Sequence, residues 1–370
     1  MVHATPDRAP ARPAPAAPPA ELSTEVLSRI FGIDDLADRL AAVDDKITTT
    51  LGGDGALLGP ASTRVAATGG KRLRPLFTIV GAALGGVFDE HAVSAAAAVE
   101  LVQVGSLVHD DILDHADTRR GRPTINAVEG VDHAVLAGDY ILARAAELAA
   151  SVSREAAALL AATLGNLCEG QVLELRDTFD PDRSIEAHLA SIRGKTAALF
   201  SCACRLGAQV GGLSERNELA LTRYGEAFGM AFQVLDDVLD LIGDAGRLGK
   251  PTGNDIASGV YTLPVLAALH GPGGGDLRRL LTGPLAGDDG QGLRAADVEG
   301  ALQLVRGSGS VPAALQTMDR YSDDARRAVA HLDQTTIGGA LAAFPRTYST
   351  WALETFMDTR FLEVPLTAMG

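Results

Sequence analysis

The segment AVSAAAAVELVQVGSLVHDDILDHAD, residues 92–117, shows most directly how this chain folds. Its apolar residues recur at spacings of three and four, which is the period of an α-helix with a buried face. A second segment of this kind, YGEAFGMAFQVLDDVLDLIGD, spans residues 224–244. Each predicts a helix longer than the globular average. Strand-like runs bounded by hairpin turns are missing from the sequence, so the predicted fold class is all-α, a helical bundle around a central cavity.

Both segments carry an acidic motif. DDILD at residues 110–114 is the first acidic motif, and DDVLD at residues 236–240 is the second. Residues i and i+4 share a helix face, so the first and last aspartates of each motif are expected to point together. At an effective dielectric constant near 20, two charges about 4 Å apart repel by roughly 4 kcal/mol. Cations would remove this repulsion, and oxygen ligands on rigid helices suit Mg²⁺.

A solvated acidic helix face is the alternative interpretation of either motif taken alone. It is disfavoured because the pattern occurs twice, each time behind an apolar run such as AFQVL at residues 231–235. Two such clusters facing each other would bind a magnesium diphosphate between them, since Mg²⁺ takes phosphate oxygens as further ligands.

The overall charge excludes several classes of partner. With 32 basic and 47 acidic residues among 370, the formal net charge is −15. A field of this sign repels nucleic acid and anionic lipid, so neither is an expected partner. An anionic substrate must therefore be bound by metal or by a local basic cluster. GGKRLRP at residues 69–75 and RRGRPT at residues 119–124 are such clusters, because arginine forks bind phosphate oxygens in pairs.

Two further lysines, Lys195 in RGKTAALF and Lys250 in LGKPTGND, are candidates for phosphate contacts. A single lysine is usually a surface residue, but the glycine beside each one is expected to let a phosphate approach closely. A diphosphate bound through metal is activated as a leaving group, because the cation neutralises the charge that develops on it. A second diphosphate bound by Arg and Lys alone is held without ionising. A site of both kinds can join two diphosphates head to tail.

The chain is expected to form one folded domain. Residues 1–20 are rich in Pro and Ala and predict a disordered tail, and residues 21–370 predict the catalytic domain. The start lacks the apolar stretch of a signal peptide, and no uninterrupted apolar run reaches the roughly 20 residues that span a bilayer. We therefore expect a soluble, cytoplasmic protein without a transmembrane segment, whose three cysteines are small core residues. Glycine-rich residues 271–310 predict short helices with flexible links.

Several motifs occur in an order that is typical of one enzyme family: GGKRLRP, HDDILD followed by RRGRPT, GDY, GKTAALF, FQVLDDVLD and GKPTGNDIASGVYTLP. Over residues 65–270 the chain resembles the all-trans polyprenyl diphosphate synthases. The resemblance implies the isoprenoid synthase fold, dependence on Mg²⁺ and a homodimer. It also implies a prenyltransferase that condenses isopentenyl diphosphate with an allylic prenyl diphosphate.

The resemblance also implies roles for single residues. The isopentenyl diphosphate contacts are Lys71, Arg74, Gln103 and Arg120. The allylic diphosphate contacts are Arg119, Lys195, Thr196, Gln233 and Lys250. The metal ligands are Asp110, Asp114 and Asp236, and the catalytic motifs are completed by Asp111, Asp237 and Asp240.

Three positions depart from the family pattern. Gln103 stands where relatives usually have His, and its amide can still donate a hydrogen bond. Glu174 in GQVLE stands where relatives often have Asp. Val260 replaces a lysine that would contact the allylic diphosphate. We expect weaker allylic binding, or compensation by Lys250, without loss of the reaction.

The mechanism implied by the resemblance has three steps. The allylic diphosphate ionises at the metal site, the double bond of isopentenyl diphosphate attacks the cation, and the departing diphosphate takes the proton that the adduct loses. No protein base is required by this scheme. His109, which precedes the first acidic motif, is therefore expected to pack and to form hydrogen bonds rather than to act as a base.

Product length is expected to depend on the helix before the first acidic motif. In the family, the fifth and fourth residues before its first Asp set the length, and here they are Gly105 and Ser106. Small residues should leave the tunnel open, with Leu148 as a deeper floor, so a medium- or long-chain product is expected. Geranylgeranyl diphosphate synthase is the alternative.

Two other functions share part of this pattern. A class I terpene cyclase normally has NDxxSxxxE as its second motif, and this chain has Asn254, Asp255 and Ser258 but Thr262 in place of Glu. A regulatory subunit of a hetero-oligomeric synthase typically lacks one acidic motif, and this chain has both. A requirement for isopentenyl diphosphate and activity of the purified chain alone separate these possibilities.

Overall fold

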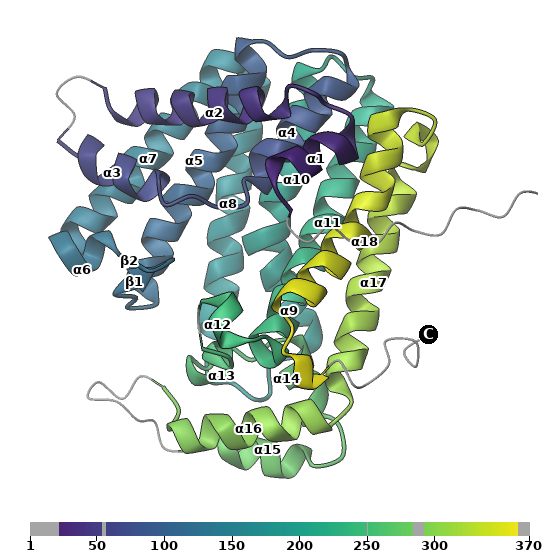
Figure 1. Cartoon of the computed structure of the whole chain (residues 1–370). Coiled ribbons are helices and arrows are strands. Elements are labelled where there is room, and N and C mark those ends of the chain that lie inside the picture. Colours follow the sequence, from purple (N-terminus) through teal and green to yellow (C-terminus); the bar gives the residue numbers. More distant parts are fainter. Residues whose placement is uncertain (1–21, 54–56, 250, 284–291, 362–370) are drawn as a thin grey trace, which may run out of the picture.

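The computed structural model describes residues 22–53, 57–249, 251–283 and 292–361, and these are almost entirely helical (Figure 1). Their longest helices are α2 (Leu36–Leu51), α5 (Glu90–Leu113), α7 (Val131–Val152), α8 (Arg154–Arg176), α11 (Glu215–Ile242), α17 (Ser310–Ala328) and α18 (Thr336–Phe356). The first acidic motif ends α5 and the second lies in α11. The all-α fold class is confirmed.

Shorter elements connect the long helices. The other α-helices are α1 (Thr24–Phe31), α3 (Gly59–Ala66), α4 (Leu73–Leu84), α6 (Ile125–Glu129), α9 (Ile185–Ile192), α10 (Ala198–Val210), α12 (Ala245–Leu248), α13 (Asn254–Ala257), α14 (Leu263–Leu269), α15 (Gly274–Leu281) and α16 (Ala295–Gly307). There are also a π-helical turn, η1 (Arg193–Ala197), and two 3₁₀ turns, η2 (Ala330–Leu332) and η3 (Thr359–Phe361). The antiparallel strands β1 (Thr118–Arg119) and β2 (Arg122–Pro123) form a small hairpin that the sequence analysis missed.

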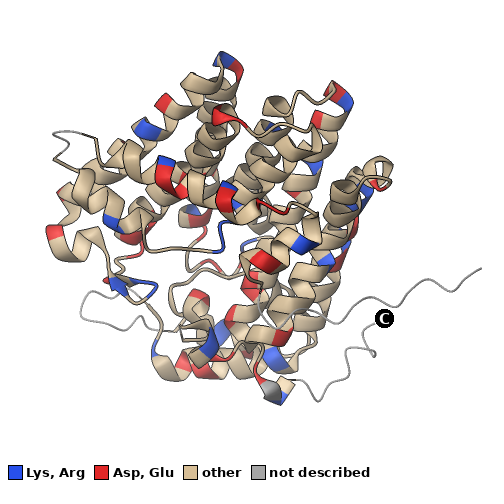
Figure 2. Ribbon diagram, turned by 45° about the horizontal axis from the view of Figure 1, so that its top comes forward, with Lys and Arg blue, Asp and Glu red and all other residues tan. Residues whose placement is uncertain are grey.

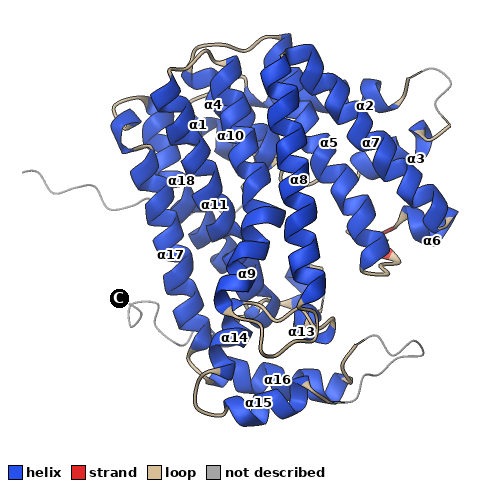
Figure 3. Cartoon of the chain, turned by 180° about the vertical axis from the view of Figure 1, so that it is seen from behind, coloured by secondary structure: helices blue, strands red, loops and turns tan. Residues whose placement is uncertain are grey.

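Helices α5, α7, α8, α11 and α17 run in roughly the same direction, whereas α2 crosses them near one end and α15 and α16 lie across the other end (Figure 1 and Figure 3). Helix α5 packs against α7 and α4, and α11 packs against α10 and α17. The four consecutive alanines Ala95–Ala98 of α5 are completely or almost completely buried. Their small side chains let neighbouring helices surround α5 on all sides, so a single polar face is absent from this part of the helix.

Aromatic residues are only 4% of the chain, and many of them gather in one part of the core. The Phe77 ring lies 4.8–6.0 Å from the rings of Phe200, Tyr224, Phe228 and Phe344, mostly edge to face. Burying one such side chain contributes about 1.5–3 kcal/mol, and an aromatic pair adds about 0.5–1.5 kcal/mol. The cluster therefore fixes α4, α10, α11 and α18 relative to one another.

The two helices that carry the acidic motifs begin at polar caps. The Asp89 carboxylate accepts hydrogen bonds from the backbone N–H groups of His91 and Ala92 at the start of α5. The Ser214 hydroxyl accepts one from the Asn217 N–H at the start of α11. Such caps satisfy N–H groups that have no partner inside the helix. The starting points of both helices are thus set by local sequence.

Two of the described helices are long and apolar enough to cross a membrane by length and composition, α5 and α8. The most apolar window of α5 is 72% buried inside the bundle, which is typical of a core helix. The corresponding window of α8 is only 28% buried, so much of this apolar helix lies on the surface of the chain.

The predictions for the tail, for residues 271–310 and for the cysteines have different outcomes. The predicted tail, residues 1–20, lies outside the described residues. Within residues 271–310, the described part contains two short helices, α15 of 8 residues and α16 of 13 residues, as predicted. Cys202 and Cys204 are buried, but Cys168 on α8 is exposed, so the prediction of three core cysteines is wrong for Cys168.

Candidate active site

The first acidic motif lies where α5 ends. Asp110 is partly exposed and Asp114, which caps the helix, is exposed. Partial burial of the carboxyl groups raises the pKa of both residues, and Lys195 lowers it in part. Solvent therefore reaches two carboxyl groups whose negative charge is costly without a cation. The structure places the predicted pair together on one side of α5.

Asp111, the middle residue of the first motif, has a different environment. It is 4% exposed, and its Oδ1 accepts a hydrogen bond of 2.5 Å from Nε of Arg119 on β1. Arg120 and Gly121, both at positive φ (52° and 72°), form the two-residue turn between β1 and β2. The hairpin thus holds Arg119 against Asp111. In this structure Arg119 stabilises the end of α5.

The second acidic motif is more deeply enclosed. Asp236 is exposed, whereas Asp237 is 2% and Asp240 1% exposed. One oxygen of Asp240 accepts a hydrogen bond of 3.2 Å from the Asp255 N–H, and its carbonyl accepts one of 2.7 Å from the Gly253 N–H. Asp240 is therefore enclosed where Asp236 is exposed, because the loop before α13 folds onto Asp240.

Asp237 is bound by two side chains. Nε2 of His188 on α9 lies 3.0 Å from Oδ2 of Asp237, and Nε2 of Gln233 donates to Oδ1 at 3.0 Å. Gln233 in turn accepts a hydrogen bond of 2.8 Å from the hydroxyl of Thr196 on η1. Thr196 and Gln233, both predicted to contact the allylic diphosphate, are thus brought together beside the second motif.

Lys195 links the two sides of the site. Its Nζ donates to Oε1 of Glu174 at 2.7 Å, and it lies near Asp110 and Asp114. Burial alone would lower the pKa of Lys195, but Glu174 and Asp110 outweigh burial and raise the pKa. The ammonium group therefore lies among three carboxylates from α5 and α8. Glu174 was not among the predicted site residues, although GQVLE was the signal that could have identified it.

The position of Lys195 depends on a close crossing of α8 and η1. A Cβ on Gly170 would lie 2.4 Å from the backbone nitrogen of Lys195, and a Cβ on Gly194 would lie 2.8 Å from the Asn166 carbonyl oxygen. Only glycine permits this approach. Gly194 was expected to admit a phosphate, and the structure shows that it admits another helix instead. The π-helical turn here is of a kind that often occurs at functional sites.

The first basic cluster approaches the site from the start of α4. Nζ of Lys71 donates to the Tyr348 hydroxyl at 2.9 Å and lies 4.7–5.2 Å from the rings of Tyr348, Trp351 and Phe356 of α18. Lys71 as a residue is exposed, but this aromatic cage encloses its ammonium group, and burial lowers its pKa to about 8. The Arg74 guanidinium lies 4.4 Å over the Phe200 ring, and burial lowers its pKa to about 10.

The remaining predicted contacts occupy several positions. Arg120 packs against the 69–71 turn, since a Cβ on Gly70 would lie 2.9 Å from its guanidinium. Gln103 lies two helical turns before Asp110 on the same face of α5. Arg72 instead binds Glu100 at 2.5 Å and Asp44 at 3.0 Å, so it holds the turn in place. Lys250 lies outside the described residues.

Helix α7 contacts α5 near the first motif. Nε2 of His109 lies 3.2 Å from the Val135 carbonyl oxygen, and a Cβ on Gly138 would lie 2.1 Å from the His109 ring. His109 therefore packs on α7, as the sequence analysis expected. A Cβ on Gly105 would lie 2.9 Å from Cγ of Leu142. The Gly105 position is thus closed by α7 in this structure.

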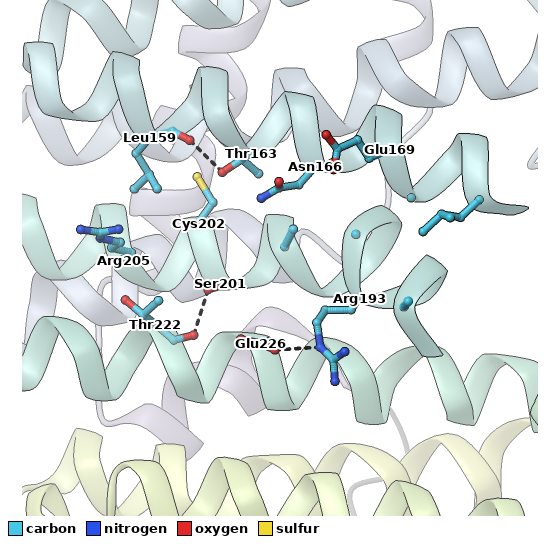
Figure 4. Close-up of a pocket in the computed structure, with 15 residues that line it drawn as sticks. Leu159, Thr163, Asn166, Glu169, Arg193, Ser201, Cys202, Arg205, Thr222 and Glu226 are labelled. Atoms are coloured by element: carbon cyan, nitrogen blue, oxygen red, sulfur yellow. Dashed lines mark hydrogen bonds and ion pairs between the residues drawn. The ribbon is translucent and has the colours of Figure 1, made fainter. Parts of the chain in front are cut away.

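A groove of about 400 Å³ lies on the outer side of η1, between α8, α10 and α11 (Figure 4). The Arg193–Glu226 ion pair, with a separation of 3.0 Å, lies in it, as do the hydrogen bonds of Thr163 and Ser201 to backbone carbonyls. Its lining residues include none of the predicted site residues. The groove is therefore separate from the candidate site.

Charges of both signs are interspersed over the molecule in Figure 2. Within the described residues, the acidic, histidine and cysteine side chains form no cluster of three or more that could hold a metal ion without further ligands. To hold a metal ion, Asp110 and Asp114 on α5 and Asp236 on α11 would need ligands from another source, and diphosphate oxygens suit this role. The oxygen-only carboxylate set fits a hard divalent cation.

A sequence model of the polyprenyl synthetase family matches residues 56–281. The chain belongs to this family. A nonaprenyl diphosphate synthase of Mycobacterium tuberculosis is 40% identical over 278 residues, which are 74% of this chain and 81% of that protein. An octaprenyl diphosphate synthase of Escherichia coli is 32% identical over 297 residues, 80% of this chain and 90% of that protein.

A solved structure agrees with this assignment. The crystal structure of a polyprenyl synthase from Caulobacter crescentus, complexed with calcium and isoprenyl diphosphate, matches with a TM-score of 0.79 and 33% identity. The match covers 89% of this chain and 98% of that chain. The predicted family and isoprenoid synthase fold are confirmed, and the chain is a prenyltransferase. Divalent metal dependence is a property that the family and the calcium complex both indicate.

Proposed function

We propose that this chain condenses isopentenyl diphosphate with an allylic prenyl diphosphate, using Mg²⁺ held by Asp110 and Asp114 on one side and Asp236 on the other. The observation that carries the proposal is the position of Lys195. Its ammonium lies among carboxylates of both α5 and α8, and the adjacent Thr196 is hydrogen-bonded to α11 at 2.8 Å. We include Glu174 in the site, since it lies 2.7 Å from Lys195.

The two diphosphates are bound by different chemistry. Lys71, Arg74 and Arg120 offer positive charge, which suits isopentenyl diphosphate, and Asp236 is close enough to Lys71 to raise its pKa in part. Lys195, Thr196 and Gln233 lie beside the two acidic motifs, which suits the allylic diphosphate. When bound, Mg²⁺ neutralises the charge that develops on the leaving diphosphate.

The protein residues then orient the reactants. The allylic C–O bond breaks, and Lys195 stabilises the negative charge left on the diphosphate. The isopentenyl double bond forms the new C–C bond with the allylic cation, while Lys71 and Arg74 keep the isopentenyl diphosphate in place. A proton leaves the adduct for the released diphosphate, so the chemistry does not require a base from the protein.

We further propose a medium- or long-chain product. The similar proteins include nonaprenyl, octaprenyl and heptaprenyl diphosphate synthases. Geranylgeranyl diphosphate is the less favoured alternative. Val260 is partly exposed beside α13, where it offers no charge. Allylic binding therefore depends on Lys195 and, as proposed from the sequence, on Lys250.

We propose that residues 21–370 form one catalytic domain that works as a cytoplasmic homodimer. The support is the apolar surface of α8, where Val172 is 63% and Leu175 47% exposed. On α7, Leu136 is 56% exposed. Large apolar surfaces of this kind mark interaction sites, and a second copy would cover them. Val172→Asp, compared with wild type by light scattering, is expected to shift the dimer towards monomer.

Purified protein, labelled isopentenyl diphosphate and each common allylic primer test the proposed function. We expect elongation with Mg²⁺ and none after thorough chelation. A protein of Geobacillus stearothermophilus that is 40% identical over 235 residues is named component 2 of a heptaprenyl diphosphate synthase. An inactive but folded purified chain would therefore contradict the homodimer and indicate a two-component enzyme.

A further inference from the structure

His188 is a buried residue that the mechanism above does not use. It lies on α9, outside both acidic motifs, and is 2% exposed. Its Nε2 is 3.0 Å from Oδ2 of Asp237, which is also 2% exposed. Because an ionised carboxylate only accepts hydrogen bonds, Nε2 carries the hydrogen of this pair. The bond joins residues that are 49 positions apart in the sequence.

Both oxygens of Asp237 are occupied by protein donors. His188 binds Oδ2 and Gln233 binds Oδ1, each at 3.0 Å. Asp237 is therefore an internal anchor of α11 and is not directed at a metal. Asp236, the next residue, is exposed. The bond from His188 holds this part of α11, including the neighbouring Asp236, against α9.

The same anchor reaches the other wall of the site. Gln233 accepts a hydrogen bond of 2.8 Å from Thr196, which follows Lys195 in η1. One chain of hydrogen bonds thus runs from α9 through α11 to η1. Buried networks of this kind hold their members rigidly, because an unpaired polar group costs more in a low-dielectric interior than in water.

A buried arginine supports the same group. The Arg183 side chain is 1% exposed and lies 3.5 Å from Asp177. Its charge also interacts favourably with Asp237 and Glu174. A buried positive charge therefore lies close enough to Asp237 to favour the hydrogen-bonded arrangement of Asp237 with His188 and Gln233.

We propose that His188 is a positioning residue for prenyl transfer. Through Asp237 it sets the direction of Asp236, and through Gln233 it sets the position of Thr196 beside Lys195. The inference rests on the metal role proposed above for Asp236. Residues that orient metal ligands typically contribute 10–100-fold to metal affinity or activity.

Three substitutions of His188 separate this role from simple packing. In His188→Gln, the amide nitrogen takes nearly the position of Nε2 and can still donate to Asp237. In His188→Asn, the amide nitrogen takes the position of Nδ1 and does not reach Asp237. His188→Leu removes the donor at similar volume. The Gln and Asn variants form a matched pair, since both are amides buried at the same place.

We measure kcat, the Mg²⁺ concentration for half-maximal activity, the KM values for both substrates and the melting temperature of each variant. We expect His188→Asn and His188→Leu to lose about 10–100-fold in kcat and to need several-fold more Mg²⁺. KM for isopentenyl diphosphate should change less than about twofold, because Lys71 and Arg74 lie on α4 and its leading turn. His188→Gln should recover most of the activity. If His188→Leu fails to fold, the comparison of His188→Gln with His188→Asn still tests whether the hydrogen bond to Asp237 matters.

Wild-type kcat and Mg²⁺ dependence in His188→Asn would overturn the proposal. Equal losses in the Gln and Asn variants with unchanged Mg²⁺ dependence would overturn it too, since packing alone would then explain them. Asp236→Asn separates the proposed metal role of Asp236 from the proposed positioning role of His188. If Asp236→Asn is fully active, the proposed metal role fails. If it is inactive while all His188 variants behave as wild type, only the inference about His188 fails.

Discussion

The two acidic motifs share the pattern DDxxD on a helix and differ in what surrounds them. At the end of α5, Asp110 and Asp114 are open to solvent and flank Lys195, and only Asp111 is bound to an arginine. In α11, Asp236 is exposed, while Asp237 and Asp240 are 2% and 1% exposed and bind protein groups. The same pattern therefore presents two carboxylates in one place and one in the other.

The cause of the difference is the chain that follows each motif, since both motifs lie at the end of their helices. The first motif ends its helix, and the hairpin that follows covers only one side of it. The second motif is followed by a loop that returns and donates the Gly253 and Asp255 N–H groups to Asp240. A shared motif thus fixes which residues are acidic, and the following chain decides which of them face the substrate.

The largest expected effect concerns the exposed aspartates. Asp114→Ala and Asp236→Ala should each lower kcat by about 10²–10³-fold, the size of effect seen when a group that stabilises transition-state charge is removed. Steady-state kinetics at saturating Mg²⁺ measure it. Glu186→Ala, an exposed acidic residue in the first turn of α9, is the control and should retain full activity. Wild-type kcat in Asp236→Ala would contradict the assignment of the second motif to the metal site.

The next effect is on stability and compares two adjacent residues. Asp237→Ala leaves the donors of His188 and Gln233 without their acceptor, which costs about 1–3 kcal/mol of unfolding free energy. Asp236→Ala removes an exposed carboxyl and should cost less than Asp237→Ala. Urea denaturation of both variants measures the difference. Equal losses would show that the burial contrast within the second motif has no energetic consequence.

A pH dependence distinguishes the two diphosphate sites. Burial lowers the pKa of Lys71 from 10.5 to about 8, so its positive charge is lost as the pH rises through about 8. The kcat/KM for isopentenyl diphosphate should then fall about tenfold per pH unit, because this ratio reports the free enzyme. The pKa of Lys195 is raised, so kcat/KM for the allylic substrate should not show this fall.

Lys71→Arg tests the assignment of that titration. Arginine keeps its charge throughout the range, so the fall should move to higher pH in this variant. A fall at the same pH in Lys71→Arg would assign the titration to another group.

The smallest effect concerns the residues before each motif. The fourth residue before the first Asp is Ser106 in the first motif and Phe232 in the second. Ser106 is partly exposed, so Ser106→Phe should shorten the product with little change in kcat. Chromatography of the labelled products measures chain length. Gly105→Phe must displace Leu142, so it should shorten products and also lower stability. An unchanged product profile in both variants would refute a tunnel at this end of α5.

The sequence predicted what depends on local pattern. The helices around both acidic motifs follow from apolar spacing, and the proximity of Asp110 and Asp114 follows from their separation of four. The hairpin was not predicted, because strands of two residues are too short to show alternating apolar and polar residues. The hydrogen bond from the Asp255 N–H to Asp240 was not predicted, because helical geometry alone does not indicate where the following loop packs.

Contacts between distant segments could not be predicted from the sequence either. The cage around Lys71 comes from α18, 277 residues away for Tyr348, and the His188–Asp237 bond joins two helices. Spacing within one helix does not encode either contact. Glu174 is intermediate, since GQVLE was noticed but only the fold shows its ion pair with Lys195.

Calorimetric binding of each diphosphate, with and without Mg²⁺, tests the central claim most directly. Binding of an unreactive allylic diphosphate analogue should require Mg²⁺ and should be lost in Asp110→Ala and Asp236→Ala. Isopentenyl diphosphate should bind equally well in a chelator, through Lys71 and Arg74. Tight binding of the allylic analogue in the chelator, unchanged in both variants, would contradict the account.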